Sequence, residues 1–419
     1  MSFERLLVPF SSRNYRLYFS GQLISLLGTW ITQTATVWLV YELTRSPAWL
    51  GLVTLLGQAP AVLLSPLGGV WVDRLDRLKL LTATQAFAMI QSLALAVFTL
   101  SGHINIWILT VLAMVQGVIT AFDLPTRQSL NFLLAEKREH LSAIIGLNSS
   151  MFNLARLVGP ALGGFIIAGV GAGWCFLIDG LSYIAVLAAI LSMRLATPKP
   201  APRTNSVWKE MREGARYAWS ILPIRALILL TGSVGMFGWS FTVLIPAYAS
   251  HVFGGDARTL GYLMSSSAVG SILAALYLAG RSSLRGLGRT IAIGGCLGGI
   301  GLFIFAFSSS LWLAVPCLVF TGMGAILVFA SSNTLVQNLV EEDKRGRVMS
   351  IYTVAFMGGM PIGGVLTGAL ADRIGVTATT CLNATACIVI VTAFYLWLPR
   401  LRAEARPILE RAGLIPKDH

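Results

Sequence analysis

The sequence predicts an all-α polytopic membrane protein, with twelve transmembrane helices arranged as two pseudo-symmetric six-helix bundles. Three observations predict this class. Charged residues make up only 12% of the 419 residues and the mean hydropathy is +0.74, whereas charged residues are about a quarter of a soluble protein. Charge-poor runs of about 20 residues, each able to cross a hydrocarbon core about 30 Å thick as a helix, recur along the chain. A motif of the first half also returns in the second.

The predicted spans follow one another with short polar connections. Each is an apolar run too long for a strand and long enough for a membrane helix. They lie near residues 15–42, 48–72, 80–100, 105–122, 142–169, 174–193, 225–250, 259–279, 290–308, 311–336, 347–371 and 376–398.

The Lys and Arg residues predict the orientation of these spans. Most of the 31 cations fall in loops on one side, together with both termini. The loops on the other side hold only Arg45, Arg258 and Arg373. By the positive-inside rule, both termini are expected in the cytoplasm. These loops, which face anionic lipid, account for the net charge of +13. The positive charge therefore does not predict nucleic-acid binding.

The sequence predicts no enzyme chemistry, no cofactor and no metal site. The five cysteines lie within or at the ends of spans without a CxxC spacing, and the four histidines are scattered. No Ser-His-Asp or HExxH pattern suggests hydrolysis. No GxxxxGK[ST] nucleotide loop suggests a primary pump. A transport or signalling function is therefore expected rather than catalysis.

An internal repeat predicts the domain organisation. The segments SSMFNLARLVGPALGGFI (149–166) and SIYTVAFMGGMPIGGVL (350–366) each place a serine before a proline, which two adjacent glycines follow. Six spans therefore repeat as six spans. The apolar side of the joining segment is expected to carry Val207, Trp208, Met211 and Ala215. The predicted parts are an N-terminal six-helix half at 1–194, a cytoplasmic linker with an amphipathic helix at 195–222, a C-terminal six-helix half at 223–399 and a cytoplasmic tail at 400–419.

Two six-helix halves joined by a cytoplasmic linker resemble the major facilitator superfamily. GGVWVDRLDRLK (68–79) resembles its signature loop between spans 2 and 3, and GPALGG (159–164) resembles the span-5 motif of its antiporters. A narrower resemblance is to the bacterial exporter branch that includes enterobactin exporters and macrolide efflux proteins. It is carried by the segments at 20–51, 121–130, 153–164 and 208–219. The resemblance implies a monomer in the bacterial inner membrane that exports a small molecule.

A stripe of polar residues marks span 1. Its members are three or four residues apart, so they share one helical face that must meet protein or water rather than lipid. Two interpretations stay open: hydrogen bonding between packed helices, or a wall of the translocation cavity, which the resemblance assigns to span 1. The candidate cavity residues are Gln22, Ser25, Thr29 and Gln33 of this stripe, with Gln116 and Trp239.

The loop between spans 2 and 3 is predicted to act as a gate. An Asp–Arg cluster at the cytoplasmic end can hold the two halves together when the inside is closed, although ordinary anchoring by cations is the alternative. Asp76 stands where the family usually has glycine, although aspartate tolerates the same left-handed turn better than most residues do. The candidate gating residues are Gly69, Asp73, Arg74 and Arg77.

Three charged residues of the first half are candidates for ion coupling: Arg156 near the bilayer centre, Asp179 in span 6 and Asp123 at the cytoplasmic end of span 4. A charge inside a membrane is costly, so each is expected to have a partner or a function. The aligned residues of the second half, Met357, Thr380 and Ser332, are uncharged.

Structural alternatives exist for each of these charges. Arg156 can form a buried pair or snorkel, and Asp179 can form an interhelical hydrogen bond. Asp123 precedes Pro125 and suits a helix break with an N-cap, with Arg127 as its ion-pair partner.

The span-5 motif consists of Gly159, Pro160, Gly163 and Gly164. Proline and paired glycines are expected to bend and thin the span so that it packs closely and moves against the other half. One departure weakens the antiporter resemblance. Proton-coupled drug exporters of the family usually carry an arginine three residues before a Gln-Gly in span 4, and this chain has Ala113 there.

The sequence therefore predicts a secondary exporter of a small amphipathic molecule, either a siderophore-like metabolite or a hydrophobic drug. It would work by alternating access with proton antiport, so protons and the bilayer are its expected partners. Two alternatives stay open: a lipid or lysolipid translocator of the same fold, and a non-transporting membrane sensor.

Overall fold

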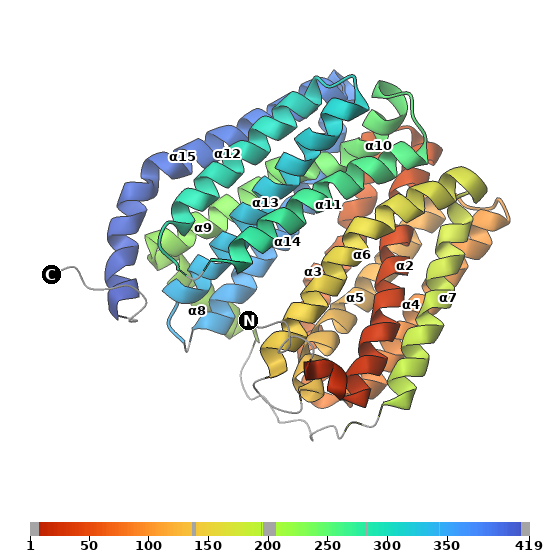
Figure 1. Cartoon of the computed structure of the whole chain (residues 1–419), viewed down its shortest axis with the longest axis horizontal. Coiled ribbons are helices and arrows are strands. Elements are labelled where there is room, and N and C mark those ends of the chain that lie inside the picture. Colours follow the sequence, from red (N-terminus) through yellow and green to blue (C-terminus); the bar gives the residue numbers. More distant parts are fainter. Residues whose placement is uncertain are drawn as a thin grey trace. The chain divides into compact units, whose positions relative to one another are not determined.

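The computed structural model describes residues 8–135, 140–193, 195, 207–281, 283–342 and 344–411, with the backbone alone at 65–74, 207–211 and 411. The described residues form helices and no strand (Figure 1). Twelve of the described helices are long and apolar enough to cross a membrane. The predicted all-α class and the predicted number of spans are therefore confirmed.

The described residues of the first half of the sequence form seven helical elements. They are η1 (Val8–Ser11), α2 (Arg13–Thr44), α3 (Pro47–Arg74), α4 (Arg77–Leu100), α5 (Ile106–Leu134), α6 (Leu141–Val170) and α7 (Ala172–Ser192).

The remainder begins with the predicted linker helix. Its elements are α8 (Val207–Ser220), α9 (Leu222–Ser233), η3 (Val234–Trp239), η4 (Ser240–Leu244), α10 (Ile245–Ala247), η5 (Tyr248–Val252), α11 (Ala257–Ala279), α12 (Leu287–Ala306), α13 (Leu311–Leu339), α14 (Arg345–Ile374) and α15 (Val376–Arg411).

The same glycine joint connects equivalent helices in the two halves. Gly171 separates α6 from α7 with a φ of 96°, and Gly375 separates α14 from α15 with a φ of 86°. This positive φ is open to glycine and strained for other residues. The repeat in sequence is thus accompanied by a repeat in backbone geometry.

Two local features differ from what the sequence suggested. Asp76 has a φ of −62° and a ψ of 119°, so it is not in a left-handed turn. It is the N-cap of α4, because its carboxylate accepts hydrogen bonds from the backbone N–H groups of Leu78 (2.9 Å) and Lys79 (3.1 Å).

The predicted helix break at Asp123 is absent, since α5 runs through Pro125 without interruption. Proline leaves carbonyls of the preceding turn without their usual donors. In the turn beside it, the Thr126 hydroxyl donates to the carbonyl of Phe122 (2.6 Å).

Span 7 is irregular, although its sequence is one uninterrupted apolar run. After α9 the backbone passes through the π-helical η3, the 3-10 helix η4, the single turn α10 and the π-helical η5. Buried polar contacts hold this segment: Ser240 Oγ lies 2.9 Å from Thr367 Oγ1, and Asn383 Nδ2 donates to the same oxygen (2.8 Å). Turns of π-helix are frequent at functional sites.

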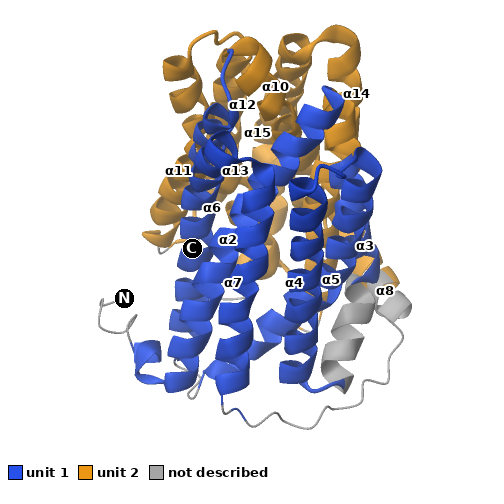
Figure 2. Cartoon of the chain, turned by 90° about the vertical axis from the view of Figure 1, so that its right-hand side faces the viewer, with its two compact units in different colours: residues 1–45, 53–204, 254–265 blue, residues 46–52, 205–253, 266–419 orange. Residues whose placement is uncertain are grey.

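Contacts between helices divide the chain into two compact units, which Figure 2 colours separately. Unit 1 comprises residues 1–45, 53–204 and 254–265, and unit 2 comprises residues 46–52, 205–253 and 266–419. The first turns of α3 therefore belong to unit 2, whereas the first turns of α11 belong to unit 1. Both exchanged segments start at the helix ends that the cation distribution predicts to face outside, called the outer ends below.

Each unit has its own apolar core. In unit 1, α7 packs against both α2 and α4, and buried side chains such as Tyr15, Leu130 and Ile144 form a cluster. In unit 2, α12 packs against α13 and α15, with a larger cluster that includes Ile224 and Val391. The linker helix α8 joins unit 2, where Arg347 Nη1 donates to Glu213 Oε2 (2.8 Å).

Candidate functional site

Asp179 is buried inside unit 1, on the face of α7 that meets α2 and α4. Its side chain is only 2% exposed. Ser92 of α4 donates to its Oδ2 (2.9 Å). Thr32 of α2 also interacts with the carboxyl group, but no described donor meets Oδ1 with normal hydrogen-bond distance and geometry. A carboxylate so enclosed is costly to keep charged, and a bound proton removes that cost. This residue is therefore well placed to exchange a proton.

The backbone of α2 lies directly against this carboxyl group. A Cβ at Gly28 would stand 2.7 Å from Asp179 Oδ1 and 2.7 Å from Ser182 Oγ. Glycine lets two membrane helices approach more closely than any other residue does. Gly28 therefore sets the separation between α2 and α7 at Asp179, because it has no side chain that would keep the two helices apart.

A second polar group lies one turn along α7. Tyr183 is 4% exposed and forms a side-chain hydrogen bond with Thr29 of α2. Because Asp179 and Tyr183 are four residues apart, they share one face of α7. Tyr183 also interacts electrostatically with Asp123 and Arg127. Buried and half-buried polar groups thus continue along unit 1 from Asp179 toward the inner ends of its helices.

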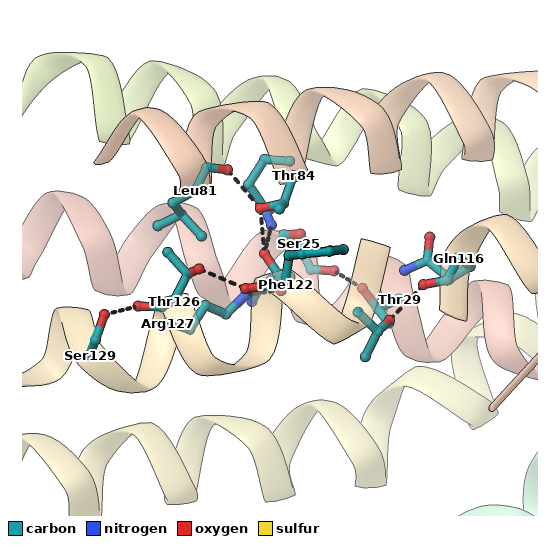
Figure 3. A network of polar contacts seen from close by, with 12 residues as sticks. Ser25, Thr29, Leu81, Thr84, Gln116, Phe122, Thr126, Arg127 and Ser129 are labelled. Carbon is teal, nitrogen blue, oxygen red and sulfur yellow. Dashed lines mark hydrogen bonds and ion pairs between the residues drawn. The ribbon is translucent and has the colours of Figure 1, made fainter. Parts of the chain in front are cut away.

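Asp123 is the centre of a network between α4 and α5. Its Oδ1 accepts hydrogen bonds from Thr84 Oγ1 (2.9 Å) and Gln85 Nε2 (2.6 Å). Its Oδ2 lies 2.5 Å from Arg127 Nε, which confirms the ion pair that the sequence suggested. In Figure 3, Thr84 and Arg127 point toward one another from neighbouring helices. A carboxylate held by three groups is suited to fixing helices together.

The polar stripe of α2 changes its environment along the helix. Gln22 and Ser25 are buried, and their side-chain polar atoms have no hydrogen-bond partner among the described residues. Thr29 donates to the carbonyl of Ser25 (3.0 Å), and Gln33 is exposed. Gln116 of α5 is half-buried. The stripe is therefore partly a buried feature of unit 1 and partly an accessible surface.

The span-5 motif brings α6 close to α2. A Cβ at Gly159 would stand 2.4 Å from Trp30 Cβ, and one at Gly163 would stand 3.2 Å from Thr34 Cβ. These glycines are four residues apart, so they form one smooth face. The close packing expected of the motif is thus present, within an α6 that is continuous through Pro160.

The other side of the motif forms a seam with the start of α11, called the α6–α11 seam. A Cβ at Gly164 would stand 2.4 Å from the carbonyl oxygen of Ala257, and a Cβ at Gly261 would stand 2.6 Å from that of Pro160. Ser265 Oγ donates to the carbonyl of Leu157 (2.8 Å). Backbone therefore meets backbone across this seam.

Unit 2 contains a matching seam between the start of α3 and α14, called the α3–α14 seam. A Cβ at Gly51 would stand 2.3 Å from the carbonyl oxygen of Gly364, and a Cβ at Gly368 would stand 2.3 Å from that of Pro47. Ser46 Oγ donates to Asp372 Oδ2 (2.5 Å). Both seams join a helix of the first half of the sequence to a helix of the second.

Arg156 lies on α6 beside an aromatic surface. It is half-buried, and Phe152, one turn earlier on the same face, is 45% exposed. Phe152 packs edge-on against Trp30, with ring centroids 5.6 Å apart. The side chains that act on Asp179 are Ser92 and Thr32, and Arg156 is not among them. The site thus combines one cation with aromatic rings.

Unit 2 presents its own aromatic row, which begins at Trp239. The ring centroids of Trp239 and Phe329 are 6.3 Å apart, and those of Phe329 and Phe356 are 4.8 Å apart. Trp239 is half-buried at the end of the π-helical η3. The irregular backbone of span 7 therefore positions this candidate cavity residue.

The candidate gating loop is described only in part. Gly69, Asp73 and Arg74 fall within the backbone-only stretch at the end of α3, so their side-chain roles lie outside the described residues. Arg77 is half-buried in the first turn of α4.

An uncharged residue, Thr380, occupies the position of the second half that is equivalent to Asp179. Thr380 is fully buried in α15 and accepts a hydrogen bond from the Tyr248 hydroxyl (3.1 Å). Both halves thus place a polar group at this position, and only the first half places an acid there.

Sequence reasoning missed the partners of Asp179. Ser92 and Gly28 are distant from Asp179 in the chain, and neither lies in a local pattern that pairs it with this acid. One signal was present for Gly28: it lies within the conspicuous polar stripe of α2.

Comparison with known proteins agrees with this architecture. The family model described as transmembrane secretion effector matches residues 5–413. The chain is 26% identical to the staphyloferrin A transporter of Staphylococcus aureus, across 91% of this chain and 95% of that one. It is 27% identical to macrolide efflux protein A of Streptococcus pyogenes, across 90% and 96%. It is 25% identical to the enterobactin exporter of Shigella boydii, across 93% and 92%.

Solved structures show the same fold. The peptide transporter POT superposes with a TM-score of 0.76 at 13% identity, across 93% of this chain and 95% of that one. A bacterial homologue of the human lysosomal transporter Spinster superposes with a TM-score of 0.69 at 14% identity, across 95% and 98%. At these identities the likeness shows the fold alone. The chain is therefore a multi-pass membrane transporter, not an enzyme, and it belongs to the transmembrane secretion effector family of the major facilitator superfamily.

Proposed function

We propose that the protein is a secondary exporter that moves a small amphipathic molecule out of the cytoplasm by alternating access, in exchange for protons. The observation that carries the coupling is Asp179, a carboxyl group that is buried between α2, α4 and α7 without a cation beside it among the described residues. The relatives named as siderophore and drug exporters support the direction of transport. We place both termini in the cytoplasm and treat the working unit as a monomer of the bacterial inner membrane.

Asp179 is the proposed proton carrier. When protonated, the acid is neutral and tolerates the closed contact with α2 at Gly28. When it releases the proton, the charge favours separation of α2 and α7 and entry of water. Ser92 stabilises this charged form, because its hydroxyl donates to Oδ2 (2.9 Å). Release of the proton is thereby linked to the contact between α2 and α7.

Tyr183 and Thr29 extend from the acid toward the inner ends of the helices. We propose that they lie on the route by which the proton leaves, with the Asp123–Arg127 pair at its inner end. Asp123 itself is held by three donors, so we assign it first to holding α4 and α5 together and only secondarily to proton transfer.

The two outer seams are the proposed moving contacts. The α6–α11 and α3–α14 seams consist mainly of glycine against backbone, with one side-chain hydrogen bond each. Such surfaces separate without disentangling large side chains. We propose that both seams open together to release substrate outside and close again afterwards.

Arg156, Phe152 and Trp30 form the proposed substrate wall of unit 1, with Gln33 on the accessible part of α2. A guanidinium beside aromatic rings suits a molecule that is both anionic and aromatic. We therefore favour a siderophore-like metabolite over an uncharged hydrophobic drug as the natural substrate. Trp239 is the corresponding candidate in unit 2.

The test is efflux of a panel of fluorescent dyes, macrolides and catechol siderophores from pump-deficient cells, with and without a protonophore. Asp179→Asn preserves the shape of the side chain but cannot exchange a proton, so it should abolish protonophore-sensitive efflux. Arg156→Ala should weaken efflux of the anionic siderophores more than that of the uncharged compounds. Glu42→Gln removes an exposed acid of α2 and is the matched control.

Membrane abundance of all variants is matched before the rates are compared. Efflux that survives both the protonophore and Asp179→Asn would contradict proton coupling through this acid. Equal loss of all substrates in Arg156→Ala would contradict its role in substrate recognition.

A further inference from the structure

A cavity of about 530 Å³ lies entirely within unit 2, at the ends of helices predicted to face the cytoplasm. Its walls come from four places in the sequence: the start of α9, the loop leading into α12, the end of α13 and the last turns of α15. Its volume is within the range of small-molecule sites. Leu227, Leu335, Phe394 and Leu398 make the interior apolar.

Three arginines line the same cavity: Arg285, Arg402 and Arg406. All three are exposed, so their guanidinium groups can reach solvent or a headgroup while their stems cover apolar surface. Arg406 Nε lies 2.7 Å from Glu410 Oε1. Arg285 and Arg402 form no ion pair with any described residue, so the cavity retains positive charge.

The loop that presents Arg285 is held in place by a neighbouring arginine. The Arg281 guanidinium donates to the backbone carbonyls of Ser283 (3.2 Å) and Arg285, and to Thr290 Oγ1 (3.1 Å). These bonds fix the backbone at Arg285 and leave its side chain available. The positive rim is therefore built by the fold.

The other wall belongs to an extension of α15 beyond the membrane. This helix has 36 residues, whereas about 20 cross a bilayer. Leu401 and Leu409 of the extension are buried against the core of unit 2, while Arg402 and Arg406 are exposed. An amphipathic helix with cations on its polar face lies at a membrane surface.

We propose that this cavity binds an anionic phospholipid of the cytoplasmic leaflet. The phosphate lies between Arg285 and Arg402, and the first part of an acyl chain enters the apolar interior beside Leu335 and Phe394. The arginines at the rim of an apolar cavity favour an anionic headgroup over a headgroup without net charge. The bound lipid ties the extension of α15 to the loop before α12 and stabilises unit 2.

The test is native mass spectrometry of the full chain, purified in detergent and given equimolar phosphatidylglycerol and phosphatidylcholine. The wild type should retain phosphatidylglycerol preferentially. The double variant R285Q/R402Q should lower retention about tenfold or more, since each cation near a headgroup contributes independently. Ala405→Phe fills the cavity without altering charge and should lower retention to a similar extent.

Arg400→Gln is the matched control, because this exposed arginine of α15 does not line the cavity. It should retain the lipid. If Arg400→Gln lowers phosphatidylglycerol retention as much as the double variant does, the effect comes from general surface charge and the proposed binding site is wrong. Equal retention of phosphatidylcholine would overturn the assignment of an anionic headgroup.

Thermal unfolding in detergent provides a second readout. Phosphatidylglycerol should raise the midpoint of the wild type and fail to raise that of either cavity variant. Inorganic phosphate in place of the lipid should have little effect. A phosphate effect as large as that of the lipid would show a simple anion site and overturn the proposal. Unchanged stabilisation in both cavity variants would overturn it as well.

Discussion

Gly28 of α2 lies directly against the carboxyl group of Asp179 in α7, where an added Cβ would stand 2.7 Å from Oδ1. The acid is therefore enclosed by a helix backbone on one side and by Ser92 of α4 on the other. Any change in the charge of Asp179 acts at the place where α2 and α7 are closest. The proton exchange that we propose at Asp179 therefore acts directly on the packing of these helices.

Substituting Gly28 tests how tight this contact is. Gly28→Ala should lower stability by about 1–3 kcal/mol, because the new methyl group meets Asp179 and Ser182 in a filled space. Transport should fall with it. Gly146→Ala in α6 is the control, since nothing lies within 4 Å of its Cβ position. Thermal unfolding in detergent and efflux measure the two effects, and equal behaviour of the two variants would contradict the tight contact.

Ser92 should set the pH at which transport works. Its hydroxyl stabilises the charged carboxylate, so Ser92→Ala should make release of the proton harder. Release then requires a higher pH, and the pH profile of efflux should move upward. Ser101→Ala, at the exposed C-cap of the same helix, should leave the profile in place. A downward move in Ser92→Ala would refute the assigned hydrogen bond.

The α6–α11 seam should tolerate no side chain at Gly164. Gly164→Val places carbon 2.4 Å from the carbonyl oxygen of Ala257, so the seam cannot close. Transport should fall at least about tenfold at matched abundance, since overpacking costs about 1–3 kcal/mol. Gly169→Val, on the same helix with nothing within 4 Å, should transport nearly normally. If both variants lose activity equally, the effect belongs to helix propensity and not to the seam.

The Asp123–Arg127 pair should act mainly on stability. Arg127→Gln leaves the half-buried carboxylate without its cation, and breaking fully buried pairs typically costs about 3–5 kcal/mol. We expect the lower end of that range because the two side chains are 15% and 22% exposed. The double variant D123N/R127Q should regain most of the unfolding midpoint. If the double variant is stable but loses protonophore-sensitive efflux, the pair acts in proton transfer instead.

The features that depend on composition could be predicted from the sequence. The twelve spans and the all-α class follow from run length and hydropathy, because the bilayer demands one helix per long apolar run. The Asp123–Arg127 pair was also predictable, since residues four apart on a helix face each other. Asp179 was identified from its charge alone.

The features that depend on tertiary contacts could not be predicted. Ser92 and Gly28 meet Asp179 only because α2, α4 and α7 pack together, and no local pattern encodes this. Asp76 stands where the family has glycine, and only the structure shows that its carboxylate provides the N-cap of α4. The π-helical turns of span 7 could not be predicted either, because an apolar run has the same composition in an α-helix and in a π-helix.

The most direct test of proton coupling is transport in proteoliposomes loaded with a substrate found by the efflux panel. Asp179→Asn should lose accumulation driven by a pH gradient while it retains exchange of substrate at equal pH, because only the proton step is removed. Glu42→Gln should retain both activities. If Asp179→Asn still accumulates substrate against a gradient at the wild-type rate, Asp179 does not carry the proton and the proposed coupling is wrong.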